Sequence, residues 1–78
     1  MREMKINDIM VISTVHWKII IKVKEIRDTE MRAFVLYDNE ADGLSWTGQM
    51  IHFSTRDLEQ SYKTEKITEG QALLEMLE

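Results

Sequence analysis

Apolar and polar residues alternate along residues 16–26, HWKIIIKVKEI. One parity is apolar and the other is mainly basic: Trp17, Ile19, Ile21 and Val23 against His16, Lys18, Lys22 and Lys24. A period of two over this length is typical of a β-strand with one face in a core and the other in water. Ile26 is apolar but shares the parity of the lysines, so we expect a β-bulge near Glu25.

Four further strands are predicted over residues 9–14, 31–37, 44–53 and 62–68. The segment 31–37 is apolar on both parities, so it is either a central strand covered on both faces or a strand that meets a partner chain. In the segment 44–53 the apolar parity switches beyond Gly48. A glycine at such a switch indicates a bulge or a sharp bend in the strand.

Two capping patterns predict helix starts in the C-terminal part of the chain. Ser54 stands three residues before Asp57 and predicts a helical turn that reaches residue 62, and Thr68 with Gln71 predicts a helix over residues 68–78. This last helix has an apolar stripe made of Leu73, Leu74 and Leu77. About ten residues make a marginal helix on their own, so we expect it to dock on the sheet or to pair.

These elements predict a mainly β protein: a β-barrel or a strongly bent antiparallel sheet over residues 8–67, with a short C-terminal α-helix over 68–78. A chain of 78 residues forms one domain over residues 1–78. Five short strands with a helical turn before the last strand resemble a small SH3-like barrel. The chain is also short, acidic and free of cysteine, and it resembles small accessory proteins of bacteriophages and mobile elements. That resemblance implies a binding protein, such as an inhibitor or adaptor of a host factor.

Charge is unevenly distributed along the chain, which has a net charge of −4. Residues 1–27 hold six basic and three acidic side chains, whereas residues 28–78 hold four basic and eleven acidic ones. The acidic excess argues against a general nucleic-acid binder. It leaves open an acidic DNA mimic, if the carboxylates gather on one face.

The sequence shows no signal-peptide pattern and no membrane-spanning run. The charged N-terminal residues are not followed by an apolar region, and no apolar run approaches the roughly 20 residues that span a bilayer. We therefore expect a soluble, cytoplasmic protein that does not contact membranes. The absence of cysteine excludes disulfides and thiolate zinc sites.

The sequence carries no catalytic signature. The three glycines form neither G-x-x-x-x-G-K nor G-x-G-x-x-G, so no phosphate-binding loop is present. Residues 38–43, DNEADG, match part of a calcium-binding loop, but Gln49 stands where the loop needs a bidentate carboxylate and the flanking segments are predicted strands. We favour an acidic hairpin loop, and we expect no metal site, no cofactor and no enzymatic activity.

Six residues are the candidate contacts with a ligand or partner: Lys18, Lys22, Lys24, Tyr37, Trp46 and His52. The three lysines could hold an anionic ligand or a nucleotide with a tryptophan stacked on its base, although a solvated strand face that protects an edge also explains them. Trp46 is the preferred contact because it lies beside the acidic turn on a strand with a polar opposite face. We expect His52, which shares the parity of Met50, to be partly buried.

Five aromatic residues could line a groove for an extended peptide, or pack in the core: Trp17, Tyr37, Trp46, Phe53 and Tyr62. The favoured function is a small non-enzymatic module that binds a protein partner. We also expect a homo-oligomer, because the strand over 31–37 and the leucines of the last helix both need cover.

Overall fold

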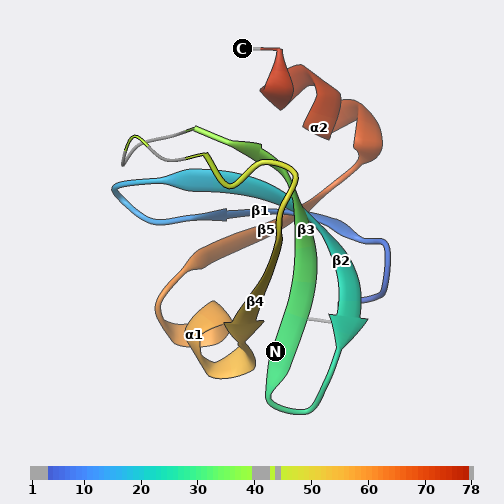
Figure 1. Cartoon of the computed structure of the whole chain (residues 1–78), viewed down its shortest axis with the longest axis vertical. Coiled ribbons are helices and arrows are strands. Elements are labelled where there is room, and N and C mark those ends of the chain that lie inside the picture. Colours follow the sequence, from blue (N-terminus) through green and yellow to red (C-terminus); the bar gives the residue numbers. More distant parts are fainter. Residues whose placement is uncertain (1–3, 40–42, 44, 78) are drawn as a thin grey trace.

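The structure is a computed structural model that describes residues 4–39, 43 and 45–77. Over these residues the chain forms five strands and two helices in the predicted order (Figure 1). Their bounds are β1 Ile9–Ser13, β2 Lys18–Ile26, β3 Glu30–Asp38, β4 Met50–Ser54, α1 Thr55–Gln60, β5 Lys63–Ile67 and α2 Glu69–Met76.

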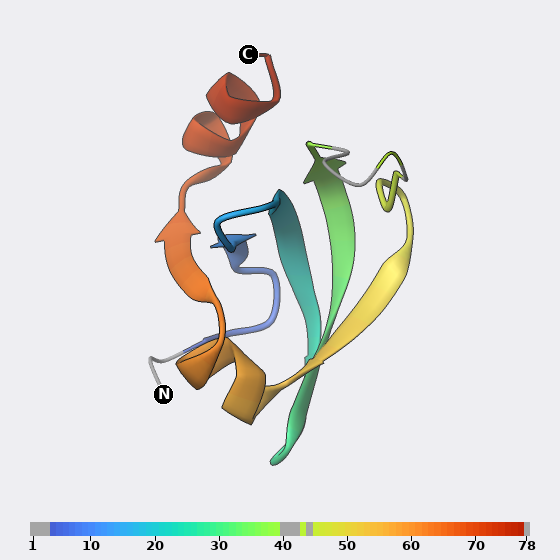
Figure 2. The same cartoon turned by 90° about the vertical axis from the view of Figure 1, so that its left-hand side faces the viewer.

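All five strands belong to one antiparallel sheet with the order β4-β3-β2-β1-β5. Strands β1 to β4 are neighbours in sequence order, and β5 returns to pair with β1 from Ile9↔Ile67 to Ser13↔Lys63. The sheet is bent, and α1 lies at the end where β4 leads back towards β5 (Figure 2). Over the described residues β4 and β5 remain the two edges, so the sheet is not closed into a barrel. The prediction of a mainly β protein with a C-terminal helix is confirmed.

A bulge near residue 24 ends the regular alternation of β2. Val23 pairs with Ala33 and Glu25 pairs with Arg32, so Lys24 is an extra residue without a place in the ladder. This irregularity is the bulge predicted near Glu25, and that prediction is confirmed.

A second bulge lies in β3 and was not predicted. Ile20 pairs with Tyr37 whereas Ile21 pairs with Val35, so Leu36 is the extra residue. Because side chains alternate between the two faces of a strand, one inserted residue places Tyr37 on the face of Ile20 instead of the face of Val35.

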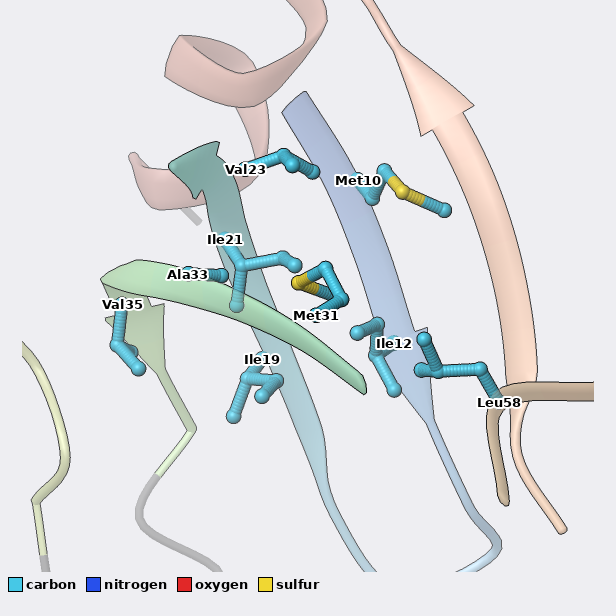
Figure 3. Close-up of a cluster of buried hydrophobic side chains, with 9 residues drawn as sticks. All are labelled: Met10, Ile12, Ile19, Ile21, Val23, Met31, Ala33, Val35 and Leu58. Carbon is cyan, nitrogen blue, oxygen red and sulfur yellow. The ribbon is translucent and has the colours of Figure 1, made fainter. Parts of the chain in front are cut away.

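The larger core lies on one face of the sheet, between β1, β2, β3 and α1 (Figure 3). It is made of nine buried side chains of the described residues: Met10, Ile12, Ile19, Ile21, Val23, Met31, Ala33, Val35 and Leu58. The apolar parity of the 16–26 segment therefore faces a core, as predicted.

A smaller core lies on the other face of the sheet, under α2. Its buried members are Ile9, Ile20 and Ala72, and five half-buried side chains surround them: Val11, Leu36, Tyr37, Ile67 and Met76. The prediction that this face of the 16–26 strand meets water is wrong at Ile20, which has no exposed surface. Of the two alternatives for the strand over 31–37, the first holds, because β3 lies between β2 and β4 and contributes to both cores.

Both helices begin where the capping patterns predicted. The Asp57 N–H donates to Ser54 Oγ over 3.0 Å at the start of α1. At the start of α2 the Gln71 N–H donates to Thr68 Oγ1 over 3.1 Å, and the Thr68 N–H donates to Gln71 Oε1 over 2.9 Å, which completes a capping box.

Helix α2 docks on the sheet, but not through its leucines. Ala72, which is 1% exposed, and Met76, one turn further along, face the smaller core. Leu73, Leu74 and Leu77 are 59%, 66% and 82% exposed. The docking stripe uses small Ala72 for close approach, so the leucine stripe seen in the sequence lies on the outside of the helix.

Candidate binding cleft

A cleft of about 420 Å³ opens beside the edge strand β4. It lies between the start of β2, the end of β3, the connection that follows β3, and β4 itself. The lining is mainly apolar and consists of Trp17, Ile19, Asp38, Trp46, Met50, Ile51, His52 and Phe53. A concave, mostly apolar surface with a few polar groups is the usual form of a binding site.

A tight turn before β4 places Trp46 over the cleft. The Gln49 N–H donates to the Trp46 carbonyl over 3.1 Å, and Gly48 has a φ of +84°, as a type II turn requires at its third position. The Gly48 N–H donates to the Val35 carbonyl, and the Val35 N–H donates to the Gln49 carbonyl. This turn explains why β4 begins at Met50, so the prediction of a strand from residue 44 is wrong over residues 45–49.

Asp38 ties the end of β3 to this turn. Its side chain is in the cleft wall, the residue is 7% exposed, and Oδ2 accepts a hydrogen bond of 2.9 Å from the Trp46 N–H. The expected acidic hairpin begins at Asp38, but Glu40 and Asp42 lie outside the described residues. Among the residues that the structure describes, no three His, Asp or Glu side chains are grouped so that they could hold a metal ion.

Aromatic packing behind the cleft fixes two of its walls. Tyr62 contacts Trp17 edge to face at 5.3 Å between ring centroids, and it contacts Phe53 in the same way at 5.7 Å. Each such pair adds about 0.5–1.5 kcal/mol beyond area burial. Trp46 and Met50, by contrast, are 43% and 54% exposed and form an accessible rim.

The cleft adjoins an open edge of the sheet. β4 pairs with β3 from Phe34↔Met50 to Glu30↔Ser54, and no other described strand pairs with it. In an antiparallel ladder every second residue of an edge strand presents its N–H and C=O outward. A chain lying along β4 would therefore find backbone donors and acceptors directly beside an apolar cleft.

The structure brings together some of the predicted contact residues. Trp46 and His52 both line the cleft. His52 is exposed rather than partly buried as predicted, because Ile51 and Phe53 occupy the parity of β4 that packs against the larger core. Tyr37 lies on the opposite face, against the smaller core, as a result of the bulge at Leu36.

The three predicted lysines lie apart from the cleft and differ from one another. Lys18 forms an ion pair with Glu75 of α2. Lys22 is half-buried, and Lys24 is the exposed extra residue of the β2 bulge. The lysines therefore do not continue as one regular row along β2.

Of the five aromatic residues that could line a groove, Trp17, Trp46 and Phe53 line the cleft and Tyr62 packs behind two of them. Sequence reasoning missed Asp38 as a structural part of the site. The available signal is an aspartate at the end of a strand and before a turn, which the sequence pattern assigns equally well to the first position of the acidic loop.

No protein family, curated protein or solved structure matches the chain. Among the described residues, neither helix has the length and apolar character needed to cross a membrane.

Proposed function

We propose that this protein is a small non-enzymatic binding module whose cleft beside β4 holds an extended segment of a partner protein. The observation that carries the proposal is the juxtaposition of an apolar cleft, an exposed Trp46 and an open strand edge. A segment that pairs with β4 gains main-chain hydrogen bonds. Its alternate side chains then point to one side, where one of them can enter the cleft.

The expected affinity is moderate. Full burial of one leucine-sized side chain contributes about 1.5–3 kcal/mol, and each hydrogen bond contributes about 0.5–1.5 kcal/mol. Ordering the segment and losing its free motion offset much of this gain. A dissociation constant on the order of micromolar, about −8 kcal/mol, suits such a site.

The topology supports the finer part of the proposal, an SH3-like arrangement. A helical segment, α1, directly before the last of five strands supports it, and the described sheet is not closed into a barrel. Domains of that class hold Pro-rich segments in aromatic-lined grooves, which supports the aromatic cleft as a binding surface, whereas the pairing with β4 rests on the open strand edge. We propose that the partner is a host protein that this module inhibits or links to another component.

The other functions considered from the sequence have less support. An anionic ligand would compete with Glu75 for Lys18. A DNA mimic needs carboxylates that are not matched by nearby cations, yet Glu25 and Glu30 both lie within ion-pair distance of Arg27. Both functions stay predictions.

Selection from a library of random peptides tests the proposed function. The immobilised protein should enrich a family of peptides, and Trp46→Ala should weaken their binding by about tenfold or more. This substitution keeps the backbone N–H that Asp38 holds, so the turn is retained.

The matched control is Ile26→Ala, which truncates an apolar side chain that is 38% exposed and lies outside the cleft lining. It should leave binding unchanged. Enriched peptides that bind Trp46→Ala as tightly as wild type, or a failure to enrich any peptide, would count against the proposal.

A further inference from the structure

The hydrogen bonds between β3 and β4 fix which backbone groups of the edge strand point outward. Just outside the two ends of β4, the Val35 N–H donates to the Gln49 carbonyl over 2.9 Å, and the Thr55 N–H donates to the Thr29 carbonyl over 3.0 Å. In an antiparallel ladder, residues that bond to the neighbouring strand alternate with residues that do not. The odd-numbered residues therefore bond to β3, and the even-numbered residues of β4 direct their N–H and C=O groups outward.

Two of these outward residues, Met50 and His52, lie beside the cleft. Both belong to its lining, and β3 is the only described strand that pairs with β4. At the other end of the strand, α1 begins at Thr55 and Tyr62 packs against Phe53. The accessible part of the edge is therefore short, and Met50 and His52 each offer it one N–H and one C=O.

An antiparallel segment makes the fullest use of so short an edge. A residue opposite Met50 and a residue opposite His52 would each exchange a pair of hydrogen bonds with β4, so about three residues of segment satisfy all the outward groups. A parallel segment needs about five residues for the same bonds, because each of its residues bonds to two different residues of β4. The short edge therefore favours the antiparallel orientation.

The residue between these two bonding positions faces the cleft. Directly opposite residues of two paired strands have their side chains on the same face of the sheet. This middle residue lies opposite Ile51, which lines the cleft and packs against the larger core. The bonding residues share the face of Met50 and His52, which are both exposed. An apolar side chain suits the middle position, whereas polar side chains suit the two bonding positions.

We propose that the partner segment is an antiparallel β-strand with alternating polar and apolar residues, which pairs through Met50 and His52 and directs its apolar side chains to the cleft. This inference rests on the proposed function and deepens it, because it names the class of segment and its register on β4. Proline is excluded from the bonding positions, since it has no N–H to donate. The segment therefore differs from the Pro-rich ligands of SH3-like domains.

A matched pair of N-methylated peptides tests the pairing. The parent is a short peptide of alternating threonine and leucine, in equal numbers and blocked at both ends. N-methylation of every leucine should change the dissociation constant by less than about twofold, because those N–H groups point away from β4. N-methylation of every threonine should weaken binding by about tenfold or more, the loss expected for two or more hydrogen bonds. NMR titration of the labelled protein measures all three peptides.

Two variants at position 52 test the same bonds from the side of the protein. His52→Pro removes the outward N–H, and an edge strand tolerates proline where its N–H faces solvent. His52→Ala removes the same side chain but retains the N–H, so it is the matched control. His52→Pro should bind the parent peptide about fivefold more weakly than His52→Ala does. Thermal midpoints show whether both variants fold, and the peptide pair decides the question without them.

Three results would overturn the proposal: a parent peptide that does not bind at millimolar concentration, equal effects of the two methylation patterns, or a larger effect of leucine methylation. The last result would indicate a parallel segment. In each case peptides enriched from the random library and weakened by Trp46→Ala would leave the proposed function standing. A library that enriches no peptide sensitive to Trp46→Ala would remove the proposed function as well, so the two failures are distinguishable.

Discussion

At the scale of single residues, the cleft depends on one buried carboxylate. Asp38 accepts the Trp46 N–H and so fixes the start of the turn that leads into β4. A hydrogen bond to a charged acceptor in a buried position contributes about 1.5–3 kcal/mol. Asp38 therefore fixes the backbone of Trp46 from the wall of the cleft. The indole ring of Trp46 stays on the rim, where a partner can reach it.

Two glycines should respond in opposite ways to the same substitution. Gly48→Ala should lower the free energy of unfolding by about 1–2 kcal/mol, because its φ of +84° is unfavourable for a residue with a Cβ. A Cβ at Gly48 meets nothing within 4 Å, so the loss comes from the backbone. Gly70→Ala should raise the free energy of unfolding by up to about 1 kcal/mol. Urea denaturation measures both, and a shift in the same direction would contradict the assigned conformations.

Asp8 should make stability depend on pH. Its Oδ2 accepts the Lys5 N–H over 2.8 Å and lies 3.3 Å from Lys66 Nζ, and the hydrogen bond from Lys5 is the main reason that the pKa of Asp8 is lowered. A carboxyl group with a lowered pKa stabilises the fold while it is ionised. This contribution is complete above the ordinary pKa of an aspartate and is lost as the pH falls through the lowered pKa.

The stability difference between wild type and Asp8→Ala should therefore be largest near neutral pH and should shrink below about pH 4. Denaturant titrations across this range measure it, with Asp28→Ala in the exposed turn before β3 as the control. A difference that stays constant or grows in acid would contradict the role of the ionised Asp8.

At the scale of elements, the sequence predicts correctly those features that depend only on residues close together in the chain. The alternation in residues 16–26 and the capping residues Ser54 and Thr68 act within a few residues, so strand β2 and both helix starts follow from the sequence. The face of Tyr37 does not follow, because the bulge at Leu36 depends on how β2 and β3 pair. The start of β4 likewise depends on hydrogen bonds between Val35 and a turn far from it in sequence.

The candidate site was predicted to a similar extent. Of the predicted contact residues, Trp46 and His52 line the cleft, Trp46 from the turn before β4 and His52 from the edge strand itself. Asp38 was missed, since its partner at position 46 becomes a neighbour only after the turn forms. The leucines of α2 were expected to need cover, by docking or by pairing, because hydrophobicity alone does not indicate that Ala72 is the residue that packs closest to the sheet.

The N-cap of α2 should make a measurable contribution to the free energy of unfolding. Thr68→Ala removes the acceptor for the Gln71 N–H and should lower the free energy of unfolding by about 1 kcal/mol. Amide hydrogen exchange of α2 should accelerate, while that of β2 and β3 should change less. Thr68→Ser retains a hydroxyl and is the matched control. Unchanged exchange in α2 would show that docking through Ala72 holds the helix without its cap.

At the scale of the whole molecule, one sheet of five described strands separates two cores. A chain of this size buries only about 60% of the surface that its unfolded form exposes, so each fully buried side chain carries a large share of the stability. The larger core between the sheet and α1 packs against side chains that line the cleft. The smaller core holds α2, which lets the molecule present two different surfaces.

Truncation of a side chain in the larger core should strongly lower the free energy of unfolding. Ile21 has no exposed surface, and Ile21→Ala should cost about 2–5 kcal/mol through lost burial and the cavity left behind. Leu74→Ala, on an exposed position, should stay within about 0.5 kcal/mol of wild type. Urea denaturation followed by tryptophan fluorescence compares the two. Similar losses for both variants would mean that the outer leucine is covered in solution.

The central claim is that an extended segment binds in the cleft along β4, and an NMR titration tests it most directly. Adding a peptide enriched by selection to ¹⁵N-labelled protein should shift the amide signals of residues 46–54 and the indole signal of Trp46. The signals of residues 69–77 should stay in place. Shifts confined to α2, or spread evenly over the sheet with residues 46–54 unchanged, would contradict the claim.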